Sequence, residues 1–276
     1  MEAPPIARRI ADIAASQWGM VTTAQARVHG IARANLAHRV RTGALERTDH
    51  YGVYRLAAAP SSPMDDLRAA WLSTNPGVLA PTRTAALQPD AVVASAAAAM
   101  VHGMGDVYPA PYRIIVPSRR QSTKGAIVYS WRALDSRDVE IVDGLPVTTR
   151  ERTVVDLLVD EGDVSIAADA LRDAMRSQYD LDETRLADLL APHAERLGRA
   201  PGNGLGGLAS LMVAAETDAV AEAGRALDRV LGSQMPLPGI EAFVEKVRLN
   251  LRDLAADSFA PVPDLTSIRA SEIGHG

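Results

Sequence analysis

The sequence predicts an α+β protein that is mostly helical. It should begin with two short helices and a β-hairpin, continue with a small antiparallel sheet flanked by helices, and end in a helical C-terminal part. Two observations carry this prediction. The chain is 47% hydrophobic but only 4% aromatic, which favours an aliphatic, largely helical core. Short β-branched runs bounded by turn residues between residues 112 and 148 predict strands. We expect domains at 1–58, 64–160 and 161–257, with a loose tail at 258–276.

The length and composition are those of a globular protein. At 276 residues the chain has room for two domains. Its longest apolar stretch, Ala91–Met104, is shorter than the roughly 20 residues that span a bilayer. Asp12 and Gln17 interrupt the segment after Arg8 and Arg9, so no signal peptide is expected. The absence of cysteine excludes disulfides, thiolate metal sites and a cysteine nucleophile. We therefore expect a cytoplasmic protein without a membrane anchor.

Charge is distributed unevenly along the chain. The net charge is −5, yet residues 1–58 hold eight arginines and four carboxylates, a net +4 that leaves −9 for the remainder. A basic head on an acidic body is typical of a DNA-reading module joined to a domain that does not bind DNA.

The N-terminal segment has the pattern of a winged helix-turn-helix. An amphipathic helix is predicted at Pro5–Trp18. Thr22 and Gln25 then form a capping box that starts a short helix, Thr23–Val28. Gly30 ends that helix, and Ile31 anchors the turn before the next. The remaining elements are a helix at Arg33–Thr42 and two strands, Ala44–Thr48 and Gly52–Leu56, joined by an Asp-x-x-Gly turn.

The helix Arg33–Thr42 has the character of a recognition helix. If Leu36 and Val40 face the core, then Ala34, His38 and Arg41 point the opposite way. Arg41 can reach guanine and Asn35 can pair with adenine, whereas Arg33 and Arg39 suit phosphates. In the hairpin, Arg47, His50 and Arg55 would lie within reach of the DNA backbone or minor groove, with His50 an exposed turn residue. The predicted DNA contacts here are Arg33, Asn35, His38, Arg39, Arg41, Arg47, His50 and Arg55.

The middle segment mixes helices and strands. Residues 57–63 read as a linker, and 75–90 as irregular chain. The predicted helices are Met64–Ser73, Ala91–Met104 and Glu151–Leu158, the last led by Thr149 or Arg150. The predicted strands are Tyr112–Val116, Ala126–Trp131 and a hairpin of Val139–Val142 with Leu145–Thr148 around Asp143-Gly144.

The succession VVASAAAAMVHGM, YRIIVPSRR and DVEIVDGLPVTTRERTVVDLL resembles the AbiEi-type antitoxins of type IV toxin–antitoxin systems. The resemblance covers about residues 6–160, and GLPVTTRERTVVDL at Gly144–Leu157 is its most specific motif. It implies an autorepressor that binds repeats in its own promoter and neutralises a toxin of nucleotidyltransferase type. It also implies a second basic patch of Arg119, Arg120 and Lys124. Ala32 stands where the family's recognition helix often begins with Ser or Thr.

The C-terminal part reads as acidic and helical. Helices are predicted at Val164–Gln178 with Asp163 as cap, Leu181–Leu190 with Asp180 or Asp182 as cap, Leu208–Ala215, Thr217–Leu231 and Glu241–Leu254. The glycine-rich 202–207 segment, GNGLGG, lacks both a preceding strand and a GK[ST] sequence, so a phosphate loop is not predicted.

No catalytic, metal or cofactor site is predicted. The only local cluster of carboxylates with a lysine, Glu241, Glu245 and Lys246, has the spacing of a solvated helix face. Three functions stay open. The favoured one is an antitoxin that represses its own promoter, reading inverted repeats as a dimer or as paired monomers, and that binds a cognate nucleotidyltransferase-like toxin. The alternatives are a stand-alone winged-helix regulator with a C-terminal dimerisation or ligand domain, and a nuclease guided by its DNA-binding module.

Overall fold

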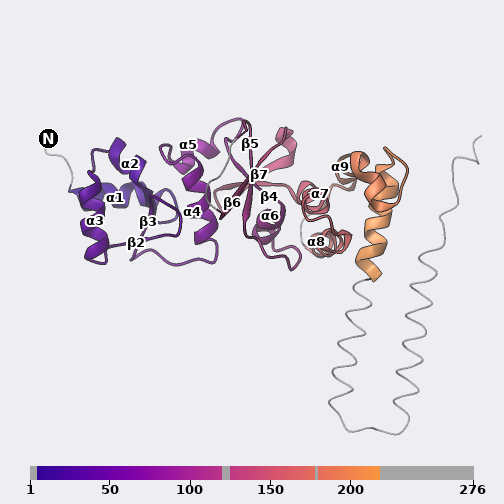
Figure 1. Ribbon diagram of the computed structural model, residues 1–276, viewed down its shortest axis with the longest axis horizontal. Coiled ribbons are helices and arrows are strands. Elements are labelled where there is room, and N and C mark those ends of the chain that lie inside the picture. Colours follow the sequence, from indigo (N-terminus) through magenta and orange to yellow (C-terminus); the bar gives the residue numbers. More distant parts are fainter. Residues whose placement is uncertain (1–4, 120–124, 178–179, 218–276) are drawn as a thin grey trace, which may run out of the picture. The chain divides into compact units, whose positions relative to one another are not determined.

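The computed structural model describes residues 5–119, 125–177 and 180–217 (Figure 1). The chain divides into two compact units, Met1–Met212 and Val213–Gly276, and the fold below is that of the first. The predicted helix Thr217–Leu231 apart from its first residue, the predicted helix Glu241–Leu254 with Glu241, Glu245 and Lys246, and the tail 258–276 lie beyond the described residues. Within the described ranges, no helix is both long and apolar enough to cross a membrane.

Residues 5–56 form a winged helix. Its three strands pair antiparallel in the order β1-β3-β2, with Met20 opposite Arg55 and Leu45 opposite Leu56. The helices pack on this sheet around a core that includes Ile10, Ile13 and Leu36. The elements are α1 (Ile6–Ala15), β1 (Met20–Thr22), α2 (Thr23–Val28), α3 (Arg33–Arg41), β2 (Leu45–Arg47) and β3 (Val53–Leu56).

Local signals set most of these boundaries. The predicted capping box is confirmed: Gln25 N–H donates to the Thr22 hydroxyl at 3.1 Å, and Thr22 N–H donates to Gln25 Oε1 at 3.0 Å. The first helix ends before the predicted Trp18, because Trp18 and Gly19 adopt φ of 58° and 76°. The chain then enters β1, which the sequence did not predict, since three residues are too few for a strand periodicity.

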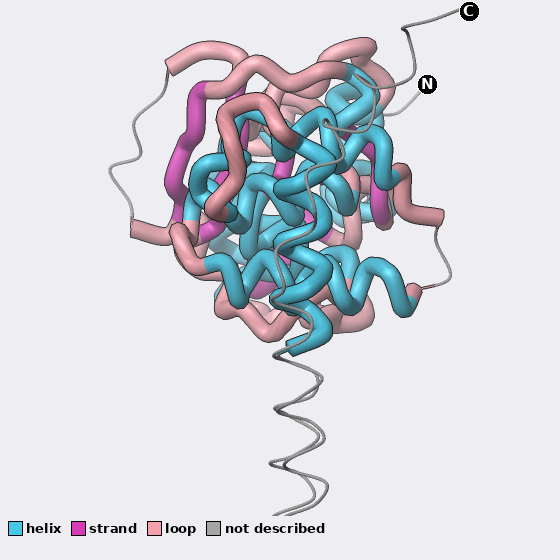
Figure 2. The backbone as a smooth tube through the Cα atoms, turned by 90° about the vertical axis from the view of Figure 1, so that its right-hand side faces the viewer, coloured by secondary structure: helices cyan, strands magenta, loops and turns pink. Residues whose placement is uncertain are grey.

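The rest of the unit is built on a five-stranded sheet in the order β6-β5-β4-β8-β7. Most of the traced backbone around it is helical (Figure 2). Its elements are α4 (Asp65–Thr74), α5 (Ala80–Thr84), β4 (Val92–Ala94), α6 (Ser95–His102), β5 (Tyr112–Val116), β6 (Ile127–Trp131), η1 (Ser136–Asp138), β7 (Val139–Val142), β8 (Leu145–Thr148), α7 (Arg150–Asp160), α8 (Val164–Arg176), α9 (Glu183–Leu190) and η2 (Ala191–Leu197). A further helix begins at residue 204.

The predicted antiparallel hairpin is confirmed, but the sheet as a whole is mixed rather than antiparallel. The β7–β8 hairpin and the β4–β5 pair are antiparallel, whereas β5–β6 and β4–β8 are parallel. β6 is parallel to β5 because it begins beside the start of β5, with Tyr112 opposite Ile127, whereas a tight hairpin would make the pair antiparallel.

Two further predictions in this region are corrected. The stretch Ala91–Met104, predicted as one helix, begins with the central strand β4 and turns into α6 at Ser95, whose φ is 55°. The stretch 75–90, predicted as irregular, contains α5. The alanines that follow favour a helix, so the local sequence did not indicate a strand. β4 forms because it pairs with β5 and β8 rather than because of local preference. The predicted caps Thr149, Asp163 and Asp182 are confirmed.

Side-chain contacts join the winged helix to the α/β part of the same unit. The Trp18 indole N–H donates to the Asp143 carbonyl at 2.8 Å, and its ring meets Trp71 edge-on at 6.0 Å. Asp66 of α4 links the two parts, because it bonds His50 Nε2 at 3.1 Å and accepts the Tyr112 hydroxyl at 2.9 Å. The wing turn is thus tied to strand β5 through one carboxylate.

Candidate nucleic-acid interface

Helices α2 and α3 form the helix-turn-helix that the sequence predicted. The turn between them is made by Gly30, with φ of 68°, and by the buried Ile31, which fills the core beneath it. Leu36 fixes the rotation of α3 because it is fully buried in the same cluster. Ala32 is the N-cap residue of α3, and its side chain makes no capping hydrogen bond.

The outward face of α3 carries the predicted recognition residues. Ala34, His38 and Arg41 are exposed, and Asn35 and Arg39 lie half-buried on the flanks. Among the described residues, neither Arg39 nor Arg41 forms an ion pair with a carboxylate. A row of cations that remain unpaired in the folded chain is suited to neutralising phosphates. The individual DNA contacts stay predictions.

The wing adds a second cationic position beside α3. Arg47 is exposed on β2, with its guanidinium 5.9 Å from the centre of the Tyr54 ring. Arg33 and Arg47 line one groove of about 260 Å³, together with Thr23 and Tyr51. Neither Thr23 nor Tyr51 is among the contacts predicted from the sequence. Thr23 could have been predicted as a groove residue, because it is the first residue of the helix-turn-helix.

Two wing residues are less accessible than predicted. His50 is not an exposed turn residue: it is 5% exposed and its ring nitrogen bonds Asp66, so its predicted DNA contact is withdrawn. The pairing partner lies 16 residues further along the chain, where local turn chemistry gives no hint of it. Arg55 is half-buried and donates to Glu46 at 2.6 Å and to the Ala59 carbonyl at 2.7 Å.

The predicted second basic patch is only partly described. Arg119 is exposed three residues after the end of β5, in the α/β part rather than in the winged helix. Arg120 and Lys124 lie outside the described residues.

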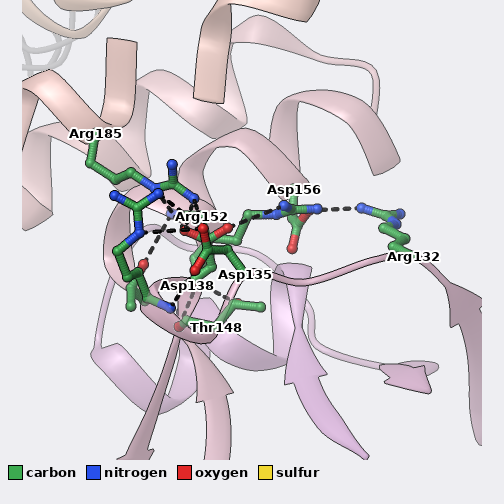
Figure 3. Close-up of polar contacts among 10 residues, drawn as sticks. Arg132, Asp135, Asp138, Thr148, Arg152, Asp156 and Arg185 are labelled. Atoms are coloured by element: carbon green, nitrogen blue, oxygen red, sulfur yellow. Dashed lines mark hydrogen bonds and ion pairs between the residues drawn. The ribbon is translucent and has the colours of Figure 1, made fainter. Parts of the chain in front are cut away.

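A chain of buried ion pairs organises the α/β part (Figure 3). Asp138 accepts Arg185 at 2.6 Å and lies 3.7 Å from Arg152. Asp156 accepts Arg152 Nε at 2.9 Å and Arg132 at 2.7 Å. Arg132 also forms an ion pair with Asp160, and Arg113 contacts the same carboxylate at 3.1 Å. These ion pairs therefore join η1, α9, α7, β5 and the residue that follows β6, and each carboxylate lies between two guanidiniums.

This cluster reads as structural rather than catalytic. Burial raises the pKa of Asp156, while the guanidiniums of Arg152 and Arg132 oppose that rise. Each of its three carboxylates contacts two guanidiniums. Across the described parts of the chain, no group of three or more His, Asp or Glu side chains could hold a metal ion.

The motif Gly144–Leu157 supplies much of this framework. Gly144 has φ of 80° in the β7–β8 turn, and a Cβ there would lie 3.1 Å from Trp18 Cζ2. The hydroxyls of Thr148 and Thr153 are 2.8 Å apart. Thr149 caps α7 by accepting Arg152 N–H. The motif therefore fixes a turn, a strand end and a helix start.

Taken together, these features define a winged-helix DNA-binding protein with an appended α/β domain. A family model described as "Transcriptional regulator, AbiEi antitoxin" matches residues 8–57, and one described as "AbiEi antitoxin C-terminal domain" matches residues 90–197. The chain belongs to the AbiEi-type antitoxins, which confirms the resemblance drawn from its sequence. It is a DNA-binding antitoxin with the domains of a transcriptional regulator.

Among solved structures, the chain is similar to the RV2827C protein from Mycobacterium tuberculosis. The two share 20% identity over 78% of each chain, with a TM-score of 0.46. No curated protein matches the chain.

Proposed function

We propose that this antitoxin represses its own promoter, by binding inverted repeats through α3 and the wing, and neutralises a nucleotidyltransferase-type toxin through the part of the chain that follows the winged helix. Two copies bound to the two half-sites would match an inverted repeat. The observation that carries the repressor role is the outward face of α3, where Arg39 and Arg41 have no carboxylate partner among the described residues although the whole chain carries a charge of −5.

The repressor role is tested by a gel-shift titration on the DNA upstream of the chain's own gene. The unmodified protein and an Arg39→Ala/Arg41→Ala variant are compared at two salt concentrations. A lost base contact costs about 1–3 kcal/mol, and each lost phosphate contact lowers the salt slope by roughly one. Arg176→Ala/Arg196→Ala removes the same charge from exposed positions outside the winged helix and should bind like the unmodified protein. Equal binding by both double variants would contradict a reading role for α3.

The antitoxin role is tested by co-expression with a nucleotidyltransferase whose gene adjoins that of this chain, and the absence of such a gene would contradict the pairing. The unmodified chain should restore growth, and so should Arg33→Ala/Arg39→Ala, because neutralisation is assigned to other residues. Loss of rescue in that variant would contradict the division into two functions. The same variant should have lost promoter binding, which shows that the substitutions took effect.

A further inference from the structure

A cavity of about 790 Å³ opens on the five-stranded sheet, away from the winged helix elements. Its floor is apolar and includes Val92 and Ile115, which cluster on one face of the sheet with Leu134 and Val139 packed against them. Three large apolar side chains at the same cavity are exposed to solvent: Leu87 is 98% exposed, Trp131 69% and Ile141 49%. Large apolar side chains gathered at one exposed site mark a binding surface, because leaving them in water is unfavourable.

The charged residues of this cavity are neutralised within the chain. Asp90 accepts Arg83 at 2.9 Å and Asn75 at 2.6 Å. Asp135 accepts Arg137 at 2.9 Å. Arg132 lies between Asp156 and Asp160 in the buried ion-pair chain. Among the described residues that line the cavity, no cation is left unpaired for a phosphate backbone, unlike the face of α3, and this lining fits an uncharged apolar segment.

We propose that this cavity is where the toxin docks, and that the toxin inserts an uncharged segment with aromatic or aliphatic side chains against Trp131 and Leu87. This inference rests on the proposed function, since it assigns a surface to the toxin partner. Trp131 is the expected anchor, because tryptophan is enriched among the few residues that dominate interface energies. The two activities of the chain would then use surfaces of different chemistry: a cationic one for DNA and a neutral apolar one for protein.

The test compares exposed apolar residues inside and outside the cavity. The purified full chain and the nucleotidyltransferase of the co-expression test are titrated by calorimetry, and rescue of growth is scored in parallel. Trp131→Ala should weaken binding by roughly 30-fold and Leu87→Ser by about 10-fold, with loss of rescue. Leu205→Ser, which removes a leucine that is 74% exposed elsewhere, is the matched control and should stay within about twofold. All three variants should keep promoter binding, which reports an intact winged helix, and an unchanged circular dichroism spectrum, which reports an intact α/β part.

Salt dependence gives an independent readout. Toxin binding should change less than about threefold between 0.1 and 0.5 M salt, whereas promoter binding should fall by more than about 100-fold. Failure of the unmodified chain to bind or rescue would overturn both the proposed function and this site. Rescue and binding that survive Trp131→Ala and Leu87→Ser would overturn the site alone. A steep salt dependence, or a change of oligomeric state in these variants that points to a second copy as the occupant, would also overturn it.

Discussion

Removing the carboxylate of Asp156 should destabilise the α/β part strongly. Asp156 is 1% exposed and accepts two guanidinium hydrogen bonds, at 2.9 Å from Arg152 and 2.7 Å from Arg132. Hydrogen bonds to charged groups contribute about 1.5–3 kcal/mol each, and breaking a buried pair costs about 3–5 kcal/mol. Arg152 and Arg132 keep Asp138 and Asp160 as partners. We therefore expect Asp156→Ala to lower the free energy of unfolding by about 3 kcal/mol.

Asp156→Asn separates the charge from the hydrogen bonds. Oδ2 of Asp156 has no hydrogen-bond partner among the described residues, so an amide nitrogen can take its place while the amide oxygen still accepts both guanidiniums. Burial raises the pKa of Asp156, which means that the ionised group carries a desolvation cost that asparagine avoids. The loss should fall to about 1–2 kcal/mol.

The measurement is urea unfolding followed by circular dichroism at pH 7. With a slope of about 2 kcal/mol per molar urea, Asp156→Ala should lower the midpoint by roughly 1.5 M at unchanged slope. Asp188→Ala, an exposed aspartate of α9, is the control and should change stability by less than about 0.5 kcal/mol. Equal losses for Asp156→Ala and Asp156→Asn, or a loss below about 1 kcal/mol for Asp156→Ala, would refute the role given to the ion-pair chain.

Three other substitutions test the packing and the titration of buried groups. Gly144→Ala forces a side chain onto φ of 80° and against Trp18, so urea unfolding should show a loss of about 1–2 kcal/mol rather than a gain. Leu36→Ala, in the core of α3, should cost about 2–5 kcal/mol and lower the thermal midpoint; an unchanged midpoint would contradict the burial that sets the α3 face. Burial lowers the pKa of His102, whose Nε2 donates to the Thr148 carbonyl at 2.7 Å. Its neutral form therefore adds stability above the unfolded-state pKa of about 6.5, which is lost as pH falls. His102→Gln should flatten the decline in unfolding free energy between pH 7 and 5, by at most about 1.4 kcal/mol per pH unit; an equally steep decline would contradict it.

Predictions that rest on neighbouring residues agree with the structure. The capping box at Thr22, the β7–β8 hairpin around Asp143-Gly144 and the caps of α7, α8 and α9 each depend on residues within a few positions of one another. The same holds for the α3 face, because one buried residue, Leu36, fixes the direction of the others.

The features that the sequence did not reveal depend on distant partners. β4 is a strand only because β5 and β8 pair with it, although its own residues run into a helix-forming series of alanines. His50 is buried because Asp66 of α4 meets it. The ion pairs of Asp138 join it to Arg185, 47 residues away. A single sequence contains no signal for such contacts, since loop closure and packing decide them.

Ion pairing also explains how an acidic chain can read DNA. In the α/β part, buried aspartates form ion pairs with Arg132, Arg152 and Arg185. These three guanidiniums are therefore not available to bind a phosphate. On α3, Arg39 and Arg41 meet no carboxylate in the described chain. Screening limits the reach of exposed charges to about 10 Å at 0.1 M salt, so a distant acidic surface does little to cancel these two arginines. The local pairing of each arginine, rather than the net charge of −5, therefore decides which surface can bind DNA.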